Sequence, residues 1–213
     1  MERPDVDGQI ILHVSDYGWR SPAMTRSQTM FCSHVVSVLR QAGAHTVLDI
    51  GCGNGALAHF LANEGFDVTG IDCDERGIAI ARRGKGRFVQ MSVYDEPTRL
   101  GSTFDAAICL EVLEHLFFPA AVPTFAYRVL KSNGILIVST PYHGWLKNLA
   151  ISFANRWDRH WNPLRDGGHI KFFSATTLRQ LLERHGFRCN HLLGIGRVPL
   201  LWKSMLAVAK KTD

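Results

Sequence analysis

"VLDIGCGNGALAHFL", residues 47–61, passes from a buried-strand pattern through a glycine-dense turn into a helix-like pattern without a break. Glycine has no Cβ, so the backbone at Gly51, Gly53 and Gly55 can approach a ligand closely. The helix that follows would begin beside that ligand. Gly51, Gly53 and Ala56 also fit the relaxed dinucleotide pattern G-x-G-x-x-G/A. The stretch therefore predicts a site for a nucleotide-like cofactor and leaves open which cofactor it is.

Strand-like and helix-like stretches alternate through the rest of the chain. The strand-like stretches are nearly continuous in Val, Ile and Leu, as a parallel sheet covered on both faces requires. We expect strands at 46–50, 67–71, 87–91, 104–110, 135–139, 187–193 and 204–210, and helices at 22–41, 56–63, 76–83, 120–130 and 174–185. The sequence therefore predicts one α/β domain, residues 1–213, built on an open sheet.

Two segments lie outside this alternation. Residues 1–42 comprise an opening stretch, 1–21, that we expect to be loose or a flap, followed by the first helix. Residues 140–173 are rich in Trp, His, Asn and Gly, and they are long for a connection after the end of a strand. We interpret this second segment as an insertion or lid on the side of the substrate.

Composition narrows the class of protein. With 46% hydrophobic and 20% charged residues, the 213-residue chain has an ordinary globular profile. No apolar run approaches the roughly 20 residues of a membrane helix, and the charged N-terminus does not resemble an export signal. Five singly spread cysteines suit reduced thiols in a cytoplasm. The net charge of +5 comes from scattered Lys and Arg, so we expect a cytoplasmic protein without a nucleic-acid partner, and contact with a membrane only in passing, through a lipid-linked substrate.

Two acidic residues bear on the choice of cofactor. Asp72 ends the second predicted strand, 21 positions after Gly51, where a carboxylate would accept both hydroxyls of a ribose. That placement suits NAD and S-adenosylmethionine equally. Asp49 lies just before the glycines, and its charge would repel a pyrophosphate but attract an ammonium group and a sulfonium. The charge balance favours S-adenosylmethionine.

An ordered series of motifs makes the chain resemble the class I S-adenosylmethionine-dependent methyltransferases. The motifs are "VLDIGCGNG", "VTGIDCDE", "FVQMSVYDEP", "FDAAICLEVLEHL", "RVLKSNGILIVSTP" and "HIKFFSATTLRQLLERHGF", which span most of the chain from Gln41 onward. The resemblance implies a Rossmann-like, seven-stranded, mostly parallel sheet with helices on both faces, and S-adenosylhomocysteine as the product. It implies cofactor contacts at the methionine end, the ribose and the adenine, by Asp49, Gly51, Cys52, Gly53, Asp72, Cys73, Ser92, Val93, Leu110 and Glu111. Ser92 stands where many relatives carry an Asp that accepts from the adenine amino group.

The stretch "EVLEH", residues 111–115, follows the fourth predicted strand at the edge where open α/β sheets bind ligands. If it is helical, Glu111, Glu114 and His115 share one face. We expect Glu111 closest to the cofactor and catalytic, His115 as the general base, and His169 as the second candidate base. A similar E-x-x-E-H occurs in the ubiquinone-pathway O-methyltransferases, and that resemblance implies an alternative in which a divalent metal assists a catechol-like acceptor. We predict no metal, because three such residues within one turn more often form a polar rim.

Large apolar residues recur at helical spacing in the long segment, from Trp145 through Leu149 and Phe153 to Trp157. This stripe predicts a helix that packs on the sheet. The alternatives are a lid over the acceptor, or a surface that rests on lipid or on another subunit. The interleaved histidines, His143, His160 and His169, suggest an aromatic acceptor pocket.

The predicted function is methyl transfer from S-adenosylmethionine to a small-molecule acceptor, most simply a hydroxyl. Two alternatives remain, an NAD(P)-dependent oxidoreductase and a non-catalytic S-adenosylmethionine-binding protein. The first needs a hydride-transfer pair, for which Tyr142 and Lys147 lack a recognisable context. A phenol, a sugar hydroxyl and a lipid-linked intermediate all stay open as acceptors, and the sequence does not give the oligomeric state.

Overall fold

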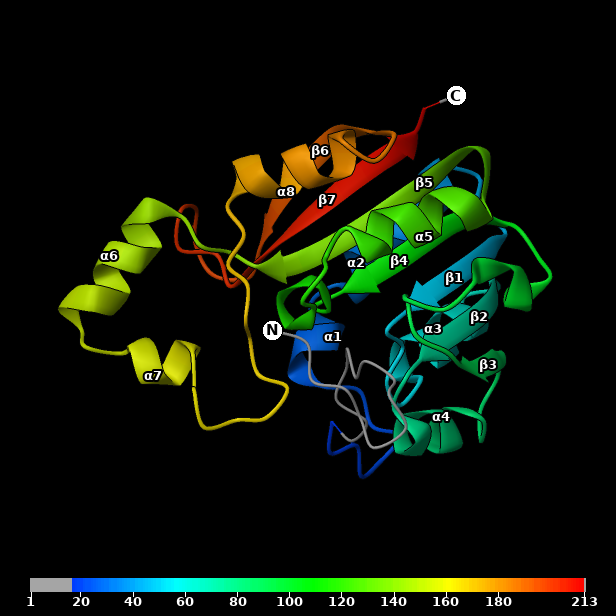
Figure 1. Ribbon diagram of the computed structural model, residues 1–213, viewed down its shortest axis with the longest axis horizontal. Coiled ribbons are helices and arrows are strands. Elements are labelled where there is room, and N and C mark those ends of the chain that lie inside the picture. The colour runs from blue at the N-terminus through cyan, green and yellow to red at the C-terminus, as the bar shows by residue number, and fades with distance from the viewer. Residues whose placement is uncertain (1–16, 213) are drawn as a thin grey trace, which may run out of the picture.

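A computed structural model describes residues 17–212, and residues 1–16 of the predicted flap lie outside this range. Seven strands form one sheet in the order β3-β2-β1-β4-β5-β7-β6 (Figure 1). They are β1 (Thr46–Ile50), β2 (Asp67–Asp72), β3 (Arg87–Gln90), β4 (Phe104–Leu110), β5 (Leu130–Pro141), β6 (Phe187–Ile195) and β7 (Ser204–Lys211). The first five are parallel, and β7 runs antiparallel to both of its neighbours. The predicted Rossmann-like sheet is confirmed.

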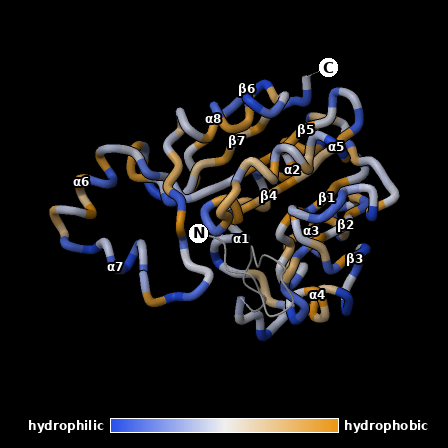
Figure 2. Tube along the Cα trace, in the orientation of Figure 1, coloured by the Kyte–Doolittle hydropathy of each residue, from blue (hydrophilic) through white to orange (hydrophobic). Residues whose placement is uncertain are grey.

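Helices cover both faces of this sheet (Figure 1). They are α1 (Arg26–Thr29), α2 (Cys32–Gln41), α3 (Ala56–Asn63), α4 (Glu75–Ala81), α5 (Ala121–Val129), α6 (Trp145–Phe153), α7 (Trp157–His160) and α8 (Ala175–Glu183), with short 3₁₀ helices η1 (Pro97–Leu100) and η2 (Leu113–His115). One core lies between the sheet and α5 with α8, and the other lies against α2, α3 and α4. Leu48 belongs to the first core and Val47 to the second, because successive side chains of a strand point to opposite faces. Figure 2 shows the hydrophobic residues running along the strands between these layers.

Local signals fix several helix ends. Ser174 caps α8, and its hydroxyl accepts from the Thr177 N–H at 3.2 Å while the Thr177 hydroxyl accepts from the Ser174 N–H at 2.9 Å. Gly186 follows with a φ of +81°, as a glycine after a helix does. The helix predicted at 22–41 is instead two helices, α1 and α2, which are separated by a turn at Met30 and Phe31.

The apolar stripe of the long segment does not pack on the sheet, so that prediction is wrong. Helix α6 projects away from the sheet together with α7 (Figure 1). Trp145 is 73% exposed and Phe153 is 85% exposed. The stripe also breaks after Phe153, because Asn155 takes a left-handed φ of +47° and Trp157 begins a separate helix.

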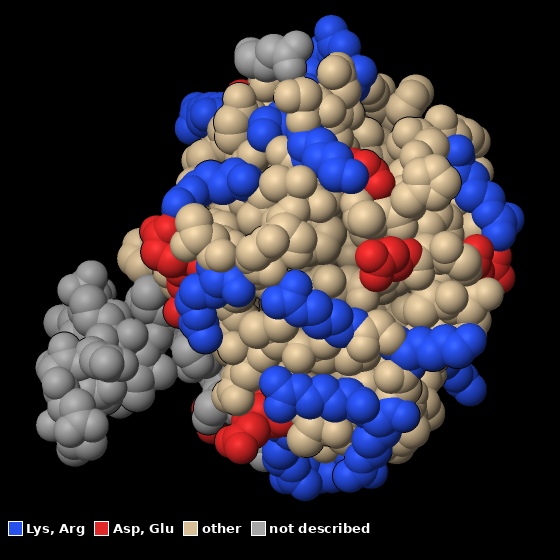
Figure 3. Space-filling model, turned by 90° about the vertical axis from the view of Figure 1, so that its right-hand side faces the viewer, with Lys and Arg blue, Asp and Glu red and all other residues tan. Residues whose placement is uncertain are grey.

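Charge is dispersed over the face seen in Figure 3, where Lys and Arg alternate with uncharged surface and with Asp and Glu. None of the helices within residues 17–212 is both long and apolar enough to cross a bilayer.

Candidate functional site

A cavity of about 470 Å³ opens at the carboxyl ends of β1, β2 and β4. Gly51, Asp72, Cys73 and Glu111, each at or just after the end of one of these strands, line it, and so do most of residues 17–25. The carboxyl edge of an open parallel sheet is where such folds bind ligands, since the loops there diverge and leave room. The cavity therefore lies where the glycine loop predicts a cofactor.

The glycine loop and Asp72 hold each other in place. The Gly53 N–H donates to Asp72 Oδ2 at 2.7 Å, and the Asp74 N–H donates to Asp72 Oδ1 at 2.8 Å. Gly51 has a φ of +77°, and a Cβ at this position would collide with Val112. These bonds fix the Asp72 carboxylate at the wall of the cavity, although burial raises its pKa.

Asp49 lies beneath the loop and not in the cavity wall. Its side chain is 3% exposed, and its Oδ2 atom has no hydrogen-bond partner. Burial first, and then the charge of Asp72, raise the pKa of Asp49 to about 7. A buried carboxylate left without a partner is costly, so a cation brought to this place would be favoured.

The other predicted cofactor residues divide between the wall and the interior. Cys73, Ser92 and Val93 line the cavity, on the side predicted for the adenine. The Ser92 N–H is already donated to Asp95 Oδ2 at 2.9 Å, whereas among the described residues the Val93 N–H has no partner. Cys52, Gly53 and Leu110 are not part of the wall, and Cys52 is fully packed in the core below the loop. Cys52 and Gly53 lie in the glycine loop, and Leu110 ends β4.

An N-terminal strap, residues 17–25, closes the cavity, and sequence reasoning assigned it no site residues. The buried Asn54 amide donates to Ser21 O at 2.8 Å and to Ala23 O at 3.0 Å. The Tyr17 N–H donates to Asp74 Oδ2 at 2.6 Å, and the Trp19 indole lies directly against Gly53. Asn54 within "GCGNG" was the only local signal for this contact, because the strap itself has no periodic pattern.

Glu111 lines the cavity but its carboxylate is tied to the sheet. The backbone turns at Glu111 with a φ of +57°, which is rare for a residue with a Cβ. Glu111 Oε1 accepts from Ser139 Oγ at 2.8 Å, and Oε2 accepts from Ser204 Oγ at 3.1 Å. The expected common face of Glu111, Glu114 and His115 is therefore wrong, because η2 begins only at Leu113 and the turn at Glu111 directs its side chain toward β5 and β7.

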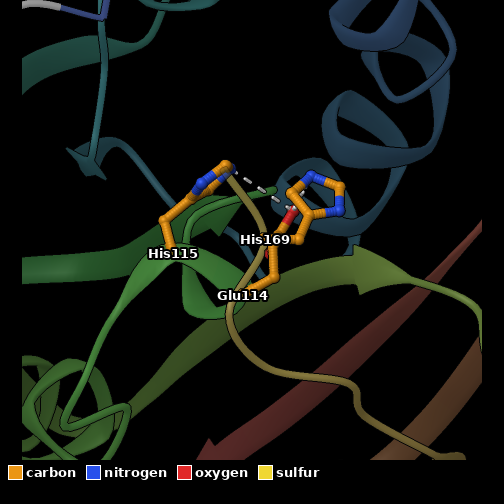
Figure 4. A group of neighbouring side chains, drawn as sticks. All are labelled: Glu114, His115 and His169. Carbon is orange, nitrogen blue, oxygen red and sulfur yellow. Dashed lines mark ion pairs between the residues drawn. The ribbon is translucent and has the colours of Figure 1, made fainter. Parts of the chain in front are cut away.

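The structure brings Glu114 and His115 together with His169 instead (Figure 4). The His115 Nε2 atom lies 4.0 Å and the His169 Nε2 atom 3.9 Å from Glu114 Oε1. His169 reaches this place because the Ile170 and Lys171 N–H groups donate to Glu114 O at 2.8 and 3.1 Å. One potential ligand atom from each residue lies within 4.8 Å of the others.

The hydrogen bonds of His115 determine its tautomer. His115 Nδ1 lies 2.6 Å from Gly167 O, and a carbonyl oxygen can only accept, so Nδ1 carries the proton. Burial lowers the pKa of His115 and so favours the neutral ring, in which Nε2 carries a lone pair. His115 lines the cavity, and its Nε2 atom lies 4.0 Å from Glu114 Oε1.

Glu114 and His169 complete the cluster with His115. Glu114 is 1% exposed, and neither of its oxygens is hydrogen-bonded, although the Thr140 hydroxyl lies nearby. Burial and the charge of Glu111 raise the pKa of Glu114 well above its usual range. Burial, and then His115, lower the pKa of His169 to about 4. One carboxyl and two neutral imidazoles are groups that can move a proton or bind a divalent cation.

The comparisons with known proteins agree with this architecture. A family model described as a methyltransferase domain matches residues 24–192. Among solved structures, the magnesium protoporphyrin IX methyltransferase of Synechocystis with bound S-adenosylhomocysteine superimposes with a TM-score of 0.64 at 22% identity, over 87% of this chain and 83% of the other. An S-adenosylmethionine-dependent methyltransferase of Clostridium acetobutylicum gives a TM-score of 0.69 at 11% identity, over 87% and 92%. At these identities the two structures support the fold.

Curated relatives extend the match to sequence. A ubiquinone biosynthesis O-methyltransferase of Dechloromonas aromatica is 37% identical over 166 residues, 75% of this chain and 72% of the relative. Its counterpart in Hydrogenovibrio crunogenus is 31% identical over 162 residues, 73% of this chain and 67% of the relative. With the family model spanning most of the chain as well, the protein belongs to the class I methyltransferases, enzymes that take their methyl group from S-adenosylmethionine.

Proposed function

We propose that this enzyme transfers the methyl group of S-adenosylmethionine to a hydroxyl of a small molecule, with His115 as the base. One observation carries the proposal: His115, whose Nδ1–H is held by the Gly167 carbonyl so that Nε2 is left to accept a proton, lines the cofactor cavity. Methyl transfer is an in-line displacement at a carbon that the sulfonium already activates, so the protein must mainly align the acceptor and remove its proton. The relatives named as O-methyltransferases agree with a hydroxyl acceptor.

The cofactor is proposed to lie along the cavity, with its ribose at Asp72. The Asp72 carboxylate is held by two backbone N–H groups and can accept from both ribose hydroxyls. The methionine end lies over Gly51, above the buried Asp49, whose unpartnered Oδ2 fits a cationic ligand nearby. The adenine lies toward Cys73 and Val93, where the free Val93 N–H can donate to the ring.

The residue types around Glu114 also fit a divalent cation. Glu114 has two buried oxygens without hydrogen bonds. The Gly167 carbonyl accepts from His115 Nδ1 and orients the ring, as a backbone carbonyl commonly does for a metal-binding histidine. Glu114, His115 and His169 would hold such an ion, with His169 in place of the Glu111 of the sequence motif. Because the ion would occupy the Nε2 lone pair of His115, this arrangement is an alternative to His115 as the base. When bound there, a divalent ion would lower the pKa of the acceptor hydroxyl. Glu111 keeps a positioning role, since its carboxylate joins the turn to β5 and β7.

Two measurements test the proposal. Calorimetry with S-adenosylhomocysteine and NADH establishes the cofactor, and binding of NADH alone would overturn the assignment. Labelled methyl transfer from S-adenosylmethionine into a metabolite extract, followed by base hydrolysis, distinguishes ethers from esters.

His115→Ala is expected to abolish most turnover without changing the affinity for S-adenosylhomocysteine, whereas His34→Ala, at an exposed position of α2, leaves both unchanged. Full turnover in His115→Ala removes this residue from the mechanism.

A further inference from the structure

A second cavity, of about 630 Å³, lies between the α6–α7 arm and the segment 161–172. Four rings line it, those of His143, Trp157, Trp161 and Phe172. None of these residues lines the cofactor cavity. Its size is typical of cavities that bind small molecules, which are about 300–1,000 Å³.

The four rings form a box around Phe172. The His143 ring centroid lies 4.3 Å from that of Phe172, the Trp161 centroid 4.1 Å and the Trp157 centroid 6.4 Å. All three rings are inclined to Phe172 by 76–83°, so each makes an edge-type contact with Phe172. The Trp157 N–H is already donated to Ser152 Oγ at 3.0 Å, so a guest meets the apolar part of the indole. The box therefore offers mainly aromatic carbon to a guest.

Polar groups at the edge of the box can serve hydroxyl groups. His143 Nδ1 lies 3.2 Å from Asn148 Oδ1, and because the amide oxygen only accepts, His143 Nε2 is left as an acceptor. In the part of the chain that the structure describes, the Asn148 amide N–H groups and the Asp158 carboxylate have no hydrogen-bond partner. The edge thus offers both donors and acceptors, and a hydroxyl can act as either.

Charge argues against an ionic guest. After burial, Lys147 lowers the pKa values of both His143 and His160, so positive charge lies behind the lining. The described lining itself holds the Asp158 carboxylate and neither Lys nor Arg. Charges of both signs therefore surround the box, and neither a cation nor an anion meets opposite charge alone. A neutral guest remains.

One segment connects the two cavities. Trp161 and Pro163 line the aromatic box, Arg165 lines the cofactor cavity, His169 belongs to the Glu114 cluster, and Phe172 returns to the box. A molecule held in the box is therefore adjacent to the chain that carries the proposed acceptor side of the reaction.

We propose that the aromatic box binds a pyranose ring of the methyl acceptor, so that the acceptor is a hydroxylated glycoside and not a bare phenol. The C–H face of a pyranose packs against an indole, and its hydroxyls radiate from the ring edge toward Asn148, Asp158 and His143. The identity of the guest as part of the acceptor rests on the proposed O-methylation. The binding of a sugar by the box does not.

Saturation-transfer NMR and tryptophan fluorescence with a panel of methyl pyranosides test the site, with catechol and tetramethylammonium as competing guests. Trp161→Ala is a suitable variant because this side chain is 40% exposed, and Trp145→Ala, 73% exposed and outside the box, is its control. We expect a methyl pyranoside to bind the native protein and Trp145→Ala, and to bind Trp161→Ala about fivefold to tenfold more weakly. Asp158→Asn should weaken the binding of the methyl pyranoside and leave the affinity for S-adenosylhomocysteine unchanged.

Binding of catechol or tetramethylammonium with no pyranoside bound would overturn the inference, as would equal pyranoside affinity in Trp161→Ala and the native protein. The proposed function fails in a different way, by the absence of labelled methyl transfer or by full turnover in His115→Ala. In that event the pyranoside titration still decides whether the box binds a sugar. Conversely, if the enzyme methylates catechol and binds no pyranoside, the proposed O-methylation stands and the sugar-binding proposal is refuted.

Discussion

Replacing Asp49 by Asn tests the site through two effects of opposite sign. The substitution preserves the size of the side chain and removes its ability to ionise. In the native protein Asp49 is 3% exposed with an unpartnered Oδ2, and burial with the charge of Asp72 raises its pKa from 3.8 to about 7. Asp49 therefore costs stability in the empty enzyme and should favour the cationic methionine end of the cofactor.

The stability effect follows from the direction of the shift. Because the pKa of Asp49 is raised in the folded protein, the free energy of unfolding is highest below about pH 4. It falls as the pH rises to about 7, because over this range Asp49 ionises in the unfolded chain before it ionises in the folded protein. The shift corresponds to a loss of roughly 4 kcal/mol in the free energy of unfolding at pH 8. At pH 5 this loss is smaller by roughly 2–3 kcal/mol. Ligand-free Asp49→Asn should therefore gain more stability over the native protein at pH 8 than at pH 5.

The binding effect runs the other way. With a pKa of about 7, Asp49 is about one-tenth ionised at pH 6 and about nine-tenths ionised at pH 8, so the affinity for S-adenosylhomocysteine should rise about tenfold between them. Asp49→Asn should bind more weakly at pH 8 and lose this pH dependence.

Calorimetry at pH 6, 7 and 8 and denaturant unfolding at pH 5 and 8 measure both effects. Asp67→Asn, an exposed acid at the start of the neighbouring strand β2, is the control and should resemble the native protein. An unchanged pH dependence of binding in Asp49→Asn, or a loss of stability at pH 8, would refute the reasoning.

Three further predictions concern other parts of the molecule. His115→Ala should lower kcat about 100-fold or more, as loss of a general base does, while His34→Ala retains native kcat in the same radiolabel assay. Trp19→Ala should weaken S-adenosylhomocysteine binding by about tenfold in calorimetry, because its indole lies over Gly53 and closes the cavity, and unaltered affinity would show that the strap is passive. Asn133 has a φ of +63°, so Asn133→Ala should lower the free energy of unfolding by about 1 kcal/mol and Asn133→Gly should not; equal stability of the two variants would contradict this.

The positions of Asp72 and the glycine loop could be predicted because they depend on local sequence. A strand, a turn that needs positive φ, and a helix follow directly from "VLDIGCGNGALAHFL", and Asp72 lies at the end of the next strand of a parallel pair. The register of that pair then brings the Gly53 N–H to the carboxylate. Periodicity and glycine placement are short-range properties, so one sequence is sufficient to read them.

The acceptor side could not be predicted in the same way. His115 and His169 are 54 positions apart in sequence, and they meet because the N–H groups of Ile170 and Lys171 bond to Glu114 O. Glu111 shares the motif with Glu114, yet a left-handed turn and the hydroxyls of Ser139 and Ser204 direct it elsewhere. Contacts of this kind leave no periodic pattern in the sequence.

The sequence by itself determined the sheet, the cofactor loop and the family of this protein, because these rest on patterns of a few residues that repeat in order along the chain. Only the tertiary structure decided which histidine joins Glu114, that the Trp145 stripe faces solvent, and that Trp19 closes the cavity. Each of these depends on contacts between segments far apart in sequence, and the path of the chain through space sets those contacts.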